Sequence, residues 1–211
     1  MYLSSFRNGN KPQELFKLLK DGRRTALILN AQDYKRVEDR ATDLTQETER
    51  LVSIGLHPEE VDLRDYFGKP KELKRRLSAF DLIWVRGGNV FVLRRAFKHS
   101  GADVMIPELL KNDAIVYGGY SAGTCIMQPD LHGIELVDDP YVIPEGYDKE
   151  IIWECLGLIP YSVAPHYKSE HPESQLISKT VDYYIEHHIP FVALHDGEAI
   201  VIDGVRQTFI E

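Results

Sequence analysis

Along most of this chain, short apolar runs alternate with segments in which apolar residues recur at helical spacing. Apolar runs of strand length predict buried strands at 25–30, near 61–63, and at 81–85, 114–118, 161–165, 191–195 and 199–203. Between several of these runs, apolar residues recur every three or four positions, which predicts helices over 37–51, 69–80, 89–101 and 173–187. Strands that alternate with helices favour an α/β fold, with a mostly parallel sheet and helices on both of its faces.

Single residues mark the ends of the predicted helices. Gly55 is expected to end the first helix, Pro70 lies in the first turn of the second, and Asn89 is a natural N-cap for the third. The first helix is expected to face the sheet with the residues that recur at helical spacing, namely Val37, Ala41, Leu44, Thr48 and Leu51. These end signals agree with the hydrophobic spacing.

Three short segments follow predicted strands and carry residues suited to chemistry. They are RGGN at 86–89, GGYSAG at 118–123 and APHY at 164–167. In open α/β sheets, ligands bind beyond the carboxyl ends of the strands. We therefore expect these three segments to share one rim of the sheet and to form a site there.

The segment at 119–123, Gly-Tyr-Ser-Ala-Gly, matches the G-x-S-x-G nucleophile elbow. In this motif a sharp strand-to-helix turn lifts a serine hydroxyl above the sheet, and glycines flank it because side chains there would collide with neighbouring backbone. The turn also leaves the amide of Ala122 available to a developing oxyanion. An ordinary glycine turn is the alternative, but the position between a strand and a helix favours Ser121 as a nucleophile.

A serine nucleophile needs a general base and a carboxylate that orients it. His166 is the best placed of the eight histidines because it follows a predicted strand at the same rim, and His171 and His195 are the alternatives. The sequence does not decide which carboxylate orients the base. One segment before the base offers Glu135, Asp138 and Asp139, and one after it offers Asp196 and Glu198.

The Gly-Gly-Asn turn at 87–89 opens a predicted helix directly after a strand. Glycine there lets the backbone approach a ligand, so the amide of Gly88 is expected to be a second oxyanion donor. The turn could equally bind a phosphate, but it lacks the glycine spacing of dinucleotide-binding folds and the lysine of the P-loop.

Composition narrows the class of protein. A chain of 211 residues that is 43% hydrophobic is expected to form one domain over 1–211. With 25 basic and 33 acidic residues its formal net charge is -8, which argues against a nucleic-acid partner.

The chain also lacks the signals of a secreted, membrane or metal-binding protein. No apolar stretch approaches the roughly 20 residues that span a bilayer, and the first residues do not follow the pattern of a secretory signal. We expect Cys125 and Cys155 to be reduced thiols of a cytoplasmic protein. No metal and no cofactor are expected, because the histidines and cysteines show no paired ligand spacing.

Taken in order, the motifs resemble the peptidase E (aspartyl dipeptidase) family of serine peptidases, to which cyanophycinase is related. The resemblance covers nearly the whole chain, through the segments at 87–89, 119–123, 138–140, 156–174 and 193–204. It implies a flavodoxin-like fold similar to class I glutamine amidotransferases, in which a cysteine takes the elbow position. An α/β-hydrolase fits less well, because His166 follows Ser121 too closely in a short chain.

The resemblance implies that Ser121 is the nucleophile, that His166 is the general base, and that the amides of Gly88 and Ala122 form the oxyanion hole. In the family, the third member comes from the loop after the nucleophile helix, which here implies Asp138 or Asp139. We expect the substrate to be contacted by Asn89, Tyr120, Tyr167 and Glu170.

One feature of this sequence departs from the family. Members that cleave after an N-terminal aspartate are expected to carry an arginine downstream of the base, because arginine pairs with a carboxylate in a bidentate way that lysine does not replace. Between Tyr167 and Arg206 this chain has no arginine. Strict Asp-X specificity is therefore doubtful, and Glu170 or Glu173 is expected to attract a free amino terminus instead.

The sequence thus predicts a cytoplasmic serine exopeptidase, dipeptidase-like, that hydrolyses small peptides through an acyl-enzyme on Ser121. Two alternatives stay open. The first is a non-catalytic member of the same fold that binds a small molecule or a partner, and the second is an amidase or esterase with a non-peptide substrate. The sequence also leaves open whether the protein forms a homodimer.

Overall fold

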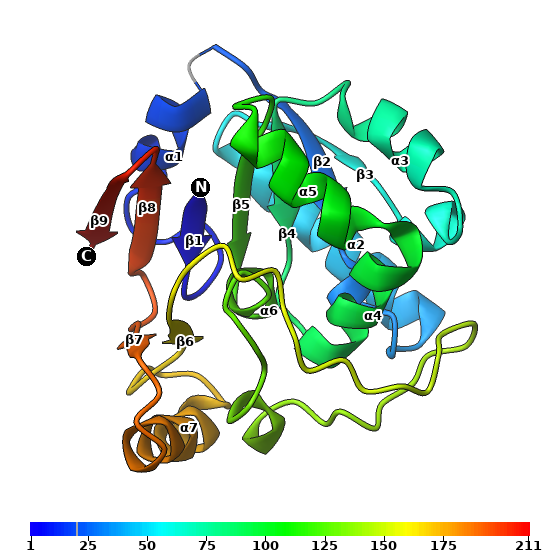
Figure 1. The fold of residues 1–211 in the computed structure, drawn as a ribbon. Coiled ribbons are helices and arrows are strands. Elements are labelled where there is room, and N and C mark those ends of the chain that lie inside the picture. The colour runs from blue at the N-terminus through cyan, green and yellow to red at the C-terminus, as the bar shows by residue number, and fades with distance from the viewer. Residues whose placement is uncertain (20) are drawn as a thin grey trace.

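A seven-stranded sheet forms the centre of the protein, whose computed structural model describes residues 1–19 and 21–211 (Figure 1). The strand order is β3-β2-β4-β5-β1-β8-β9. These strands are β1 (Tyr2–Ser4), β2 (Arg24–Ile28), β3 (His57–Glu60), β4 (Leu82–Val85), β5 (Val116–Tyr120), β8 (Ala199–Asp203) and β9 (Arg206–Ile210). All pairs from β3 to β1 are parallel, and β8 and β9 add an antiparallel edge.

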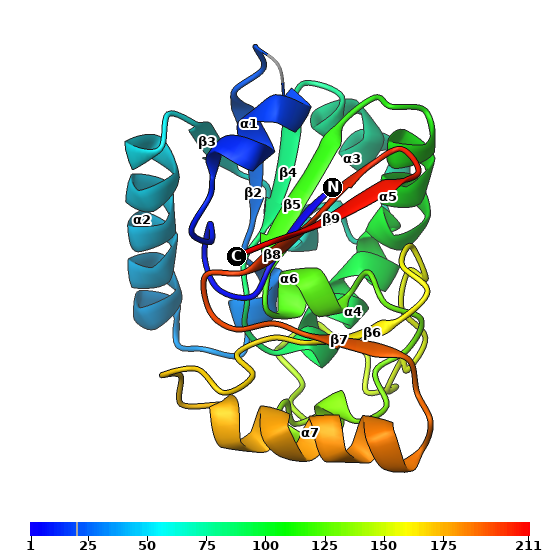
Figure 2. The same ribbon diagram turned by 90° about the vertical axis from the view of Figure 1, so that its left-hand side faces the viewer.

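Helices cover both faces of this sheet (Figures 1 and 2). One face carries α1 (Gln13–Leu19) and α2 (Val37–Ser53), and the other carries α3 (Pro70–Leu77), α4 (Val90–Ser100) and α5 (Ala102–Lys111). Successive strand residues point to opposite faces, so Ala26 and Ile28 belong to one core and Leu27 and Leu29 to the other. The predicted mostly parallel sheet with helices on both faces is confirmed.

A second, two-stranded sheet lies beyond the carboxyl ends of β4 and β5 (Figure 2). It pairs β6 (Ser162–Ala164) with β7 (Phe191–Ala193) in parallel, and α7 (Ser174–Glu186) connects the two strands. The expectation that 164–167 follows a strand of the main sheet was therefore wrong. The small sheet instead packs against α6 (Ala122–Cys125), where Cys125 Sγ lies 3.7 Å from the Val163 carbonyl oxygen.

Local polar contacts account for a further difference from the predicted elements. The strand expected near 61–63 ends earlier, at Glu60, because Asp62 caps the short helix η2 (Leu63–Tyr66) by accepting a hydrogen bond from the Arg64 amide. The sequence patterns also missed β1, α1, β9 and α5: β1 and α1 are short, β9 begins with three polar residues at the edge of the sheet, and α5 follows α4 without an intervening strand.

The helix α2 turns a charged face toward the sheet. Its buried residues are Arg40, Glu47 and Leu51, while Val37 is 80% exposed. Glu47 accepts a hydrogen bond from Trp84 Nε1 at 2.8 Å, and Arg40 is paired as well. The predicted apolar stripe is therefore wrong in part, because buried charges that are paired leave no trace in hydrophobic periodicity.

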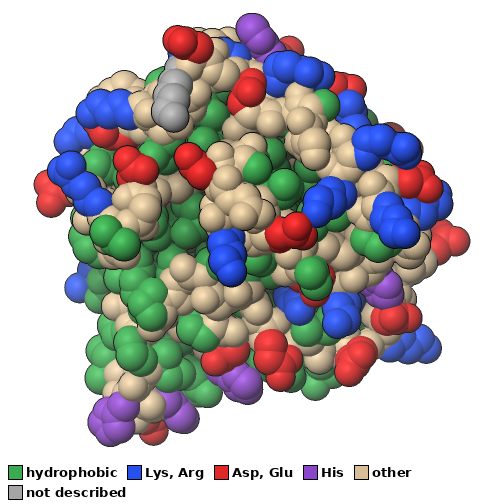
Figure 3. Space-filling view, turned by 45° about the horizontal axis from the view of Figure 1, so that its top comes forward, with side chains coloured by type: hydrophobic (Ala, Val, Ile, Leu, Met, Phe, Trp, Pro, Cys, Tyr) green, Lys and Arg blue, Asp and Glu red, His purple; other side chains and the backbone are tan. Residues whose placement is uncertain are grey.

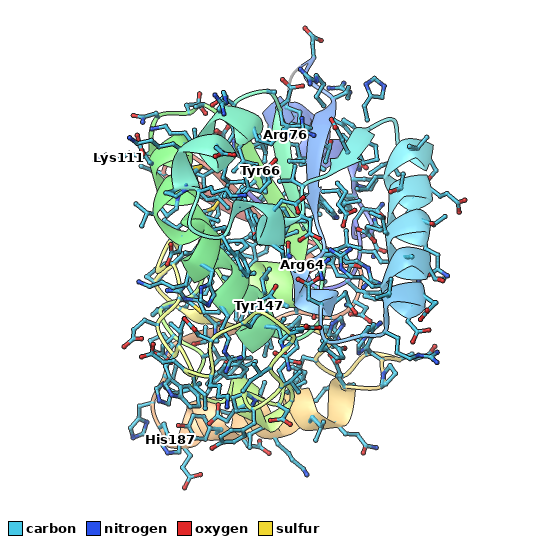
Figure 4. The ribbon with its side chains drawn as sticks, turned by 90° about the vertical axis from the view of Figure 1, so that its right-hand side faces the viewer. Arg64, Tyr66, Arg76, Lys111, Tyr147 and His187 are labelled. Atoms are coloured by element: carbon cyan, nitrogen blue, oxygen red, sulfur yellow. The ribbon has the colours of Figure 1, made fainter. Side chains whose placement is uncertain are left out.

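A buried network of charges fixes the turn η1 (Asn30–Gln32) at the end of β2. Asp33 accepts hydrogen bonds from Arg40 Nε at 2.6 Å and from the Tyr147 hydroxyl at 2.5 Å. Arg64 Nε lies 3.5 Å from the same carboxylate, and Figure 4 shows Arg64 and Tyr147 close to each other on neighbouring segments. The network ties η1 to α2, to η2 and to the loop that contains Tyr147.

The surface mixes charges of both signs. On the face in Figure 3, Lys and Arg side chains are interspersed with Asp and Glu side chains. Within residues 1–19 and 21–211, no helix combines the length and the apolar composition that crossing a membrane requires.

Candidate active site

Ser121 lies on a strained turn between β5 and α6. Its φ is 52° and its ψ is -118°, a conformation that is costly for a residue with a side chain and is the one a nucleophile elbow uses. A Cβ atom on Gly123 would lie 2.2 Å from the Val85 carbonyl oxygen, and one on Gly119 would lie 2.8 Å from it. Both flanking positions therefore require glycine, because β4 ends directly against the turn.

His166 follows β6 and is 1% exposed. Its Nδ1 lies 2.7 Å from Asp196 Oδ1. A carboxylate at this position makes Nδ1 the protonated nitrogen, so Nε2 is left to accept a proton. His166 and Ser121 line one cleft, and within the described residues no hydrogen bond joins them.

Within residues 1–19 and 21–211, the structure does not bring the carboxylates expected from the loop after the nucleophile helix, Asp138 and Asp139, into contact with His166. Asp138 Oδ2 accepts a hydrogen bond from the Val90 amide at 2.8 Å, and Asp139 Oδ1 accepts one from the Tyr141 amide at 2.8 Å. In the described part of the chain, neither is bonded to His166.

The packing explains why. Arg95 of α4 donates hydrogen bonds to the carbonyl oxygens of Pro140 and Glu150, which holds that loop on α4. Asp196 instead follows β7, the direct partner of β6, and so arrives beside His166.

Ser5, which sequence reasoning missed, joins these residues. Its carbonyl oxygen accepts a hydrogen bond from the Ser121 amide at 3.2 Å. Its hydroxyl accepts one from the His166 amide at 2.8 Å and donates one to Asp196 Oδ1 at 2.9 Å. Ser5 is fully buried directly after β1, so the N-terminal strand of the sheet sets the relative positions of all three residues.

The two backbone amides expected to form the oxyanion hole belong to Gly88, which lines the cleft together with Ser121, and to Ala122, which follows Ser121 in the chain. Gly88 has a φ of 146°, and a Cβ there would lie 2.5 Å from the Ala31 carbonyl oxygen, so only glycine fits. The neighbouring Gly87 packs against Ser121, since a Cβ on Gly87 would lie 2.8 Å from Ser121 Cβ. In the described residues, the amides of Gly88 and Ala122 have no hydrogen-bond partner.

A stack of aromatic rings covers His166. The ring of His171 lies parallel to it, with centroids 3.6 Å apart and 7° between the planes, and Phe6 meets both rings edge-on. Burial lowers the pKa of His166 to about 4, helped by the charge of His171 and opposed by Asp196. His166 is therefore neutral near pH 7, the state that a general base requires.

The cleft at Ser121 encloses about 210 Å³. Its cationic side chains, Lys35 and Arg86, both pair with Asp43, at 2.8 and 2.9 Å. The other residues around it are Phe6, Gln32, Tyr34, Gly87, Gly88, Tyr120, Ser121, His166, His171 and Glu173.

Of the four residues expected to contact the substrate, one, Tyr120, is among the residues that line the cleft. Tyr120 lines the cleft and donates a hydrogen bond to Glu47 Oε2 at 3.2 Å. Asn89 caps α4 by accepting a hydrogen bond from Val92, so its amide is used structurally. Tyr167 and the exposed Glu170 are not among the residues that line the cleft.

One group of described residues offers three potential metal ligands within 4.8 Å of one another, namely His166, His171 and Glu173. The parallel rings oppose a shared ion, because in-plane lone pairs of stacked imidazoles do not converge. In addition, Nδ1 of His166 faces Asp196, and Nδ1 of His171 accepts the Glu173 amide at 3.3 Å. We interpret the group as an imidazole stack beside a carboxylate.

Comparison with known proteins gives a consistent set of relatives. The family model described as "Peptidase family S51" matches residues 9–210. An uncharacterized peptidase from Listeria monocytogenes is 34% identical over 157 residues, which are 73% of this chain and 71% of that protein. A Drosophila melanogaster protein named "Probable alpha-aspartyl dipeptidase" is 28% identical over 74% of this chain, and the match spans 63% of that protein. Peptidase E from Streptomyces coelicolor is 29% identical over 62% of this chain and 52% of its own length.

Solved structures agree. A crystal structure of a Listeria monocytogenes protein described as a peptidase E has a TM-score of 0.79 at 26% identity, covering 99% of this chain and 96% of that one. A peptidase from an acI-B1 actinobacterium has a TM-score of 0.68 at 11% identity, covering 99% and 86%, and shows the shared fold alone. The predicted resemblance, the flavodoxin-like fold and the peptidase function are confirmed. Because the family model covers nearly the whole sequence, the chain belongs to peptidase family S51.

Proposed function

We propose that this peptidase is a serine exopeptidase of the dipeptidase type, with Ser121, His166 and Asp196 as its catalytic triad. The observation that carries the proposal is the arrangement around Ser5, which contacts all three residues at one cleft. The amides of Gly88 and Ala122 complete the site as the oxyanion hole.

Acylation begins when Ser121 Oγ attacks the scissile carbonyl carbon and its proton passes to His166 Nε2. The C–O bond forms, and the carbonyl oxygen becomes an oxyanion that accepts hydrogen bonds from Gly88 and Ala122. Asp196 stabilises the imidazolium through Nδ1. His166 then protonates the leaving amine, and the C–N bond breaks to leave an ester on Ser121.

Deacylation repeats these steps with water. His166 takes a proton from a water molecule that attacks the ester carbon, and the oxyanion again forms against the two amides. His166 returns the proton to Ser121 Oγ as the C–O bond breaks. The acyl product leaves with a free carboxylate.

We also propose that the substrates are small peptides and that the reaction takes place in the cytoplasm. A cleft of about 210 Å³ suits a short peptide better than a folded chain. Cys125 and Cys155 are unpaired thiols, which suits a reducing compartment.

Hydrolysis of a dipeptide panel tests the proposal. Wild type and Ser121→Ala are compared on Asp-X, Glu-X, Gly-X and Lys-X, and wild type is treated with a fluorophosphonate that labels activated serines. We expect turnover by wild type, loss of about 10³-fold or more in Ser121→Ala, and labelling at Ser121. Equal turnover by the variant, or labelling elsewhere, would contradict the proposed nucleophile. Labelling of Ser121 without peptide turnover would favour an amidase or esterase.

A further inference from the structure

Glu173 brings a carboxylate to the cleft of Ser121. Its side chain is 41% exposed, so a ligand in the cleft can reach it. His171 Nδ1 lies 3.9 Å from Glu173 Oε2, but this nitrogen accepts the Glu173 amide and so presents no proton to the carboxylate. Partial burial raises the pKa of Glu173, the charge of His171 opposes the rise, and Asp196 adds to it.

Gln32 provides a second, independent acceptor at the same cleft. The residue is 5% exposed, and its Nε2 donates a hydrogen bond to the Gly87 carbonyl oxygen. Its Oε1 is buried, and in residues 1–19 and 21–211 it has no hydrogen-bond partner. Buried acceptors are nearly always satisfied, and Gln32 lines the cleft, so a ligand that enters there can supply the missing donor.

Asp138, Lys35 and Arg86 are the other charged residues to consider beside Glu173. Asp138 interacts through its charge with two residues of the cleft: it raises the pKa of Tyr34, and Glu173 raises the pKa of Asp138. Burial raises the pKa of Asp138 to about 7, the Val90 amide opposes the rise, and Glu173 adds to it. Lys35 and Arg86 both pair with Asp43, and in the described residues neither forms an ion pair with Glu173.

We propose that Glu173 and Gln32 form a receptor for the ammonium group of an unacylated amino terminus, and that the first residue of the substrate is neutral or basic rather than acidic. This inference rests on the proposed function, since it describes how the same cleft selects a peptide. An ammonium group is a compact cation with three donors, which matches a carboxylate oxygen and a lone carbonyl oxygen. An aspartate at the first position would instead add a negative charge beside Glu173.

Kinetics with four peptides, Ala-Leu, Lys-Leu, Asp-Leu and N-acetyl-Ala-Leu, test the receptor. We expect wild type to cleave Ala-Leu and Lys-Leu with kcat/KM at least about tenfold above the other two peptides, equivalent to about 1.4 kcal/mol. Glu173→Gln should raise KM for Ala-Leu by about tenfold and reduce the preference over N-acetyl-Ala-Leu. The matched control Asp182→Asn removes one charge from an exposed position of α7 and should leave both values unchanged. Preference for Asp-Leu, or equal rates with the acetylated peptide, would overturn the receptor.

Binding to Ser121→Ala separates this inference from the proposed function, because it needs no catalysis. Calorimetry with Ala-Leu and N-acetyl-Ala-Leu should show at least about tenfold tighter binding of the free amine, and Glu173→Gln in the same background should remove the difference. If wild type cleaves no peptide but the variant discriminates in this way, the receptor stands and the peptidase chemistry falls. Equal affinity for both peptides, or no binding of either, would overturn the receptor even if the enzyme is active.

Discussion

At the scale of single residues, Ser5 supports a prediction about positioning. Its hydroxyl donates to Asp196 and accepts from the His166 amide, so Ser5→Ala leaves the carboxylate with one hydrogen bond fewer. Loss of a hydrogen bond to a charged group should lower kcat roughly 10- to 100-fold with KM nearly unchanged. Steady-state kinetics on any cleaved dipeptide measure this. The control is Ser4→Ala, because the hydrogen bonds that Ser4 Oγ makes within the described residues are long, at 3.3 and 3.4 Å, and go to carbonyl oxygens. A rise in KM with kcat intact would show that Ser5 shapes the cleft instead.

The pH dependence of activity follows from the surroundings of His166. Its pKa is lowered from 6.5 to about 4, chiefly by burial and then by the charge of His171, while Asp196 opposes the shift. The neutral imidazole is the active form, so kcat/KM should stay level from neutral pH downward and fall only as the pH approaches about 4. His171→Phe keeps a ring against His166 but removes the neighbouring charge, and should move this acid limb to higher pH. An acid limb near 6.5 in wild type, with circular dichroism unchanged at that pH, would contradict the assignment.

Single residues also show which parts of the candidate site could be predicted from the sequence. Ser121, Gly119 and Gly123 form a local motif, so their geometry could be predicted from the chain alone. Asp196 was one of several carboxylates left open by the residues, because only the pairing of β6 with β7 selects it. Ser5 carried no signal at all. Its role comes from β1 lying between β5 and β8, which no local pattern encodes.

At the scale of elements, the network around Asp33 supports a prediction of stability. Asp33 and Arg40 form an ion pair with side-chain exposures of 0% and 10%, and Tyr147 donates to the same carboxylate. Asp33→Ala leaves Arg40 with Glu60 and Asp62 but removes its most buried partner, so the free energy of unfolding should fall by about 1.5–3 kcal/mol. Urea unfolding measures the change. Asp39→Ala breaks an exposed pair with Arg36 and should cost no more than about 0.5 kcal/mol. Equal effects of the two variants would refute the view that this network holds η1.

The elements themselves were predictable where hydrophobic spacing is the dominant signal. The strands β2, β4 and β8 and the helices α4 and α7 lie within a few residues of their predicted ranges. The spacing did not predict which face of α2 is buried, because Arg40 and Glu47 are buried through pairing and not through hydrophobicity. Nor did it predict that β6 and β7 form their own sheet, since a short apolar strand has the same hydrophobic pattern whichever sheet it joins.

At the scale of the whole molecule, the candidate triad depends on the complete fold. Ser5 follows β1, Ser121 follows β5, His166 follows β6 and Asp196 follows β7, so these side chains meet only when both sheets are in place. A site assembled from such distant segments should be lost in the same cooperative step as the tertiary structure.

We therefore expect fluorophosphonate labelling of Ser121 and near-ultraviolet circular dichroism to fall with the same midpoint in a urea titration. Samples equilibrated at each urea concentration are labelled briefly, and labelling in the native baseline corrects for the effect of urea on the probe. Coincident transitions follow if Ser5, His166 and Asp196 stay in place until the sheet unfolds, because labelling needs the serine to be activated. Labelling that is lost at clearly lower urea would mean that β6, β7 and α7 detach first while the seven-stranded sheet persists. In that case the small sheet is a separate cooperative unit, and the geometry of the site is set by its docking against α6 and not by the sheet alone.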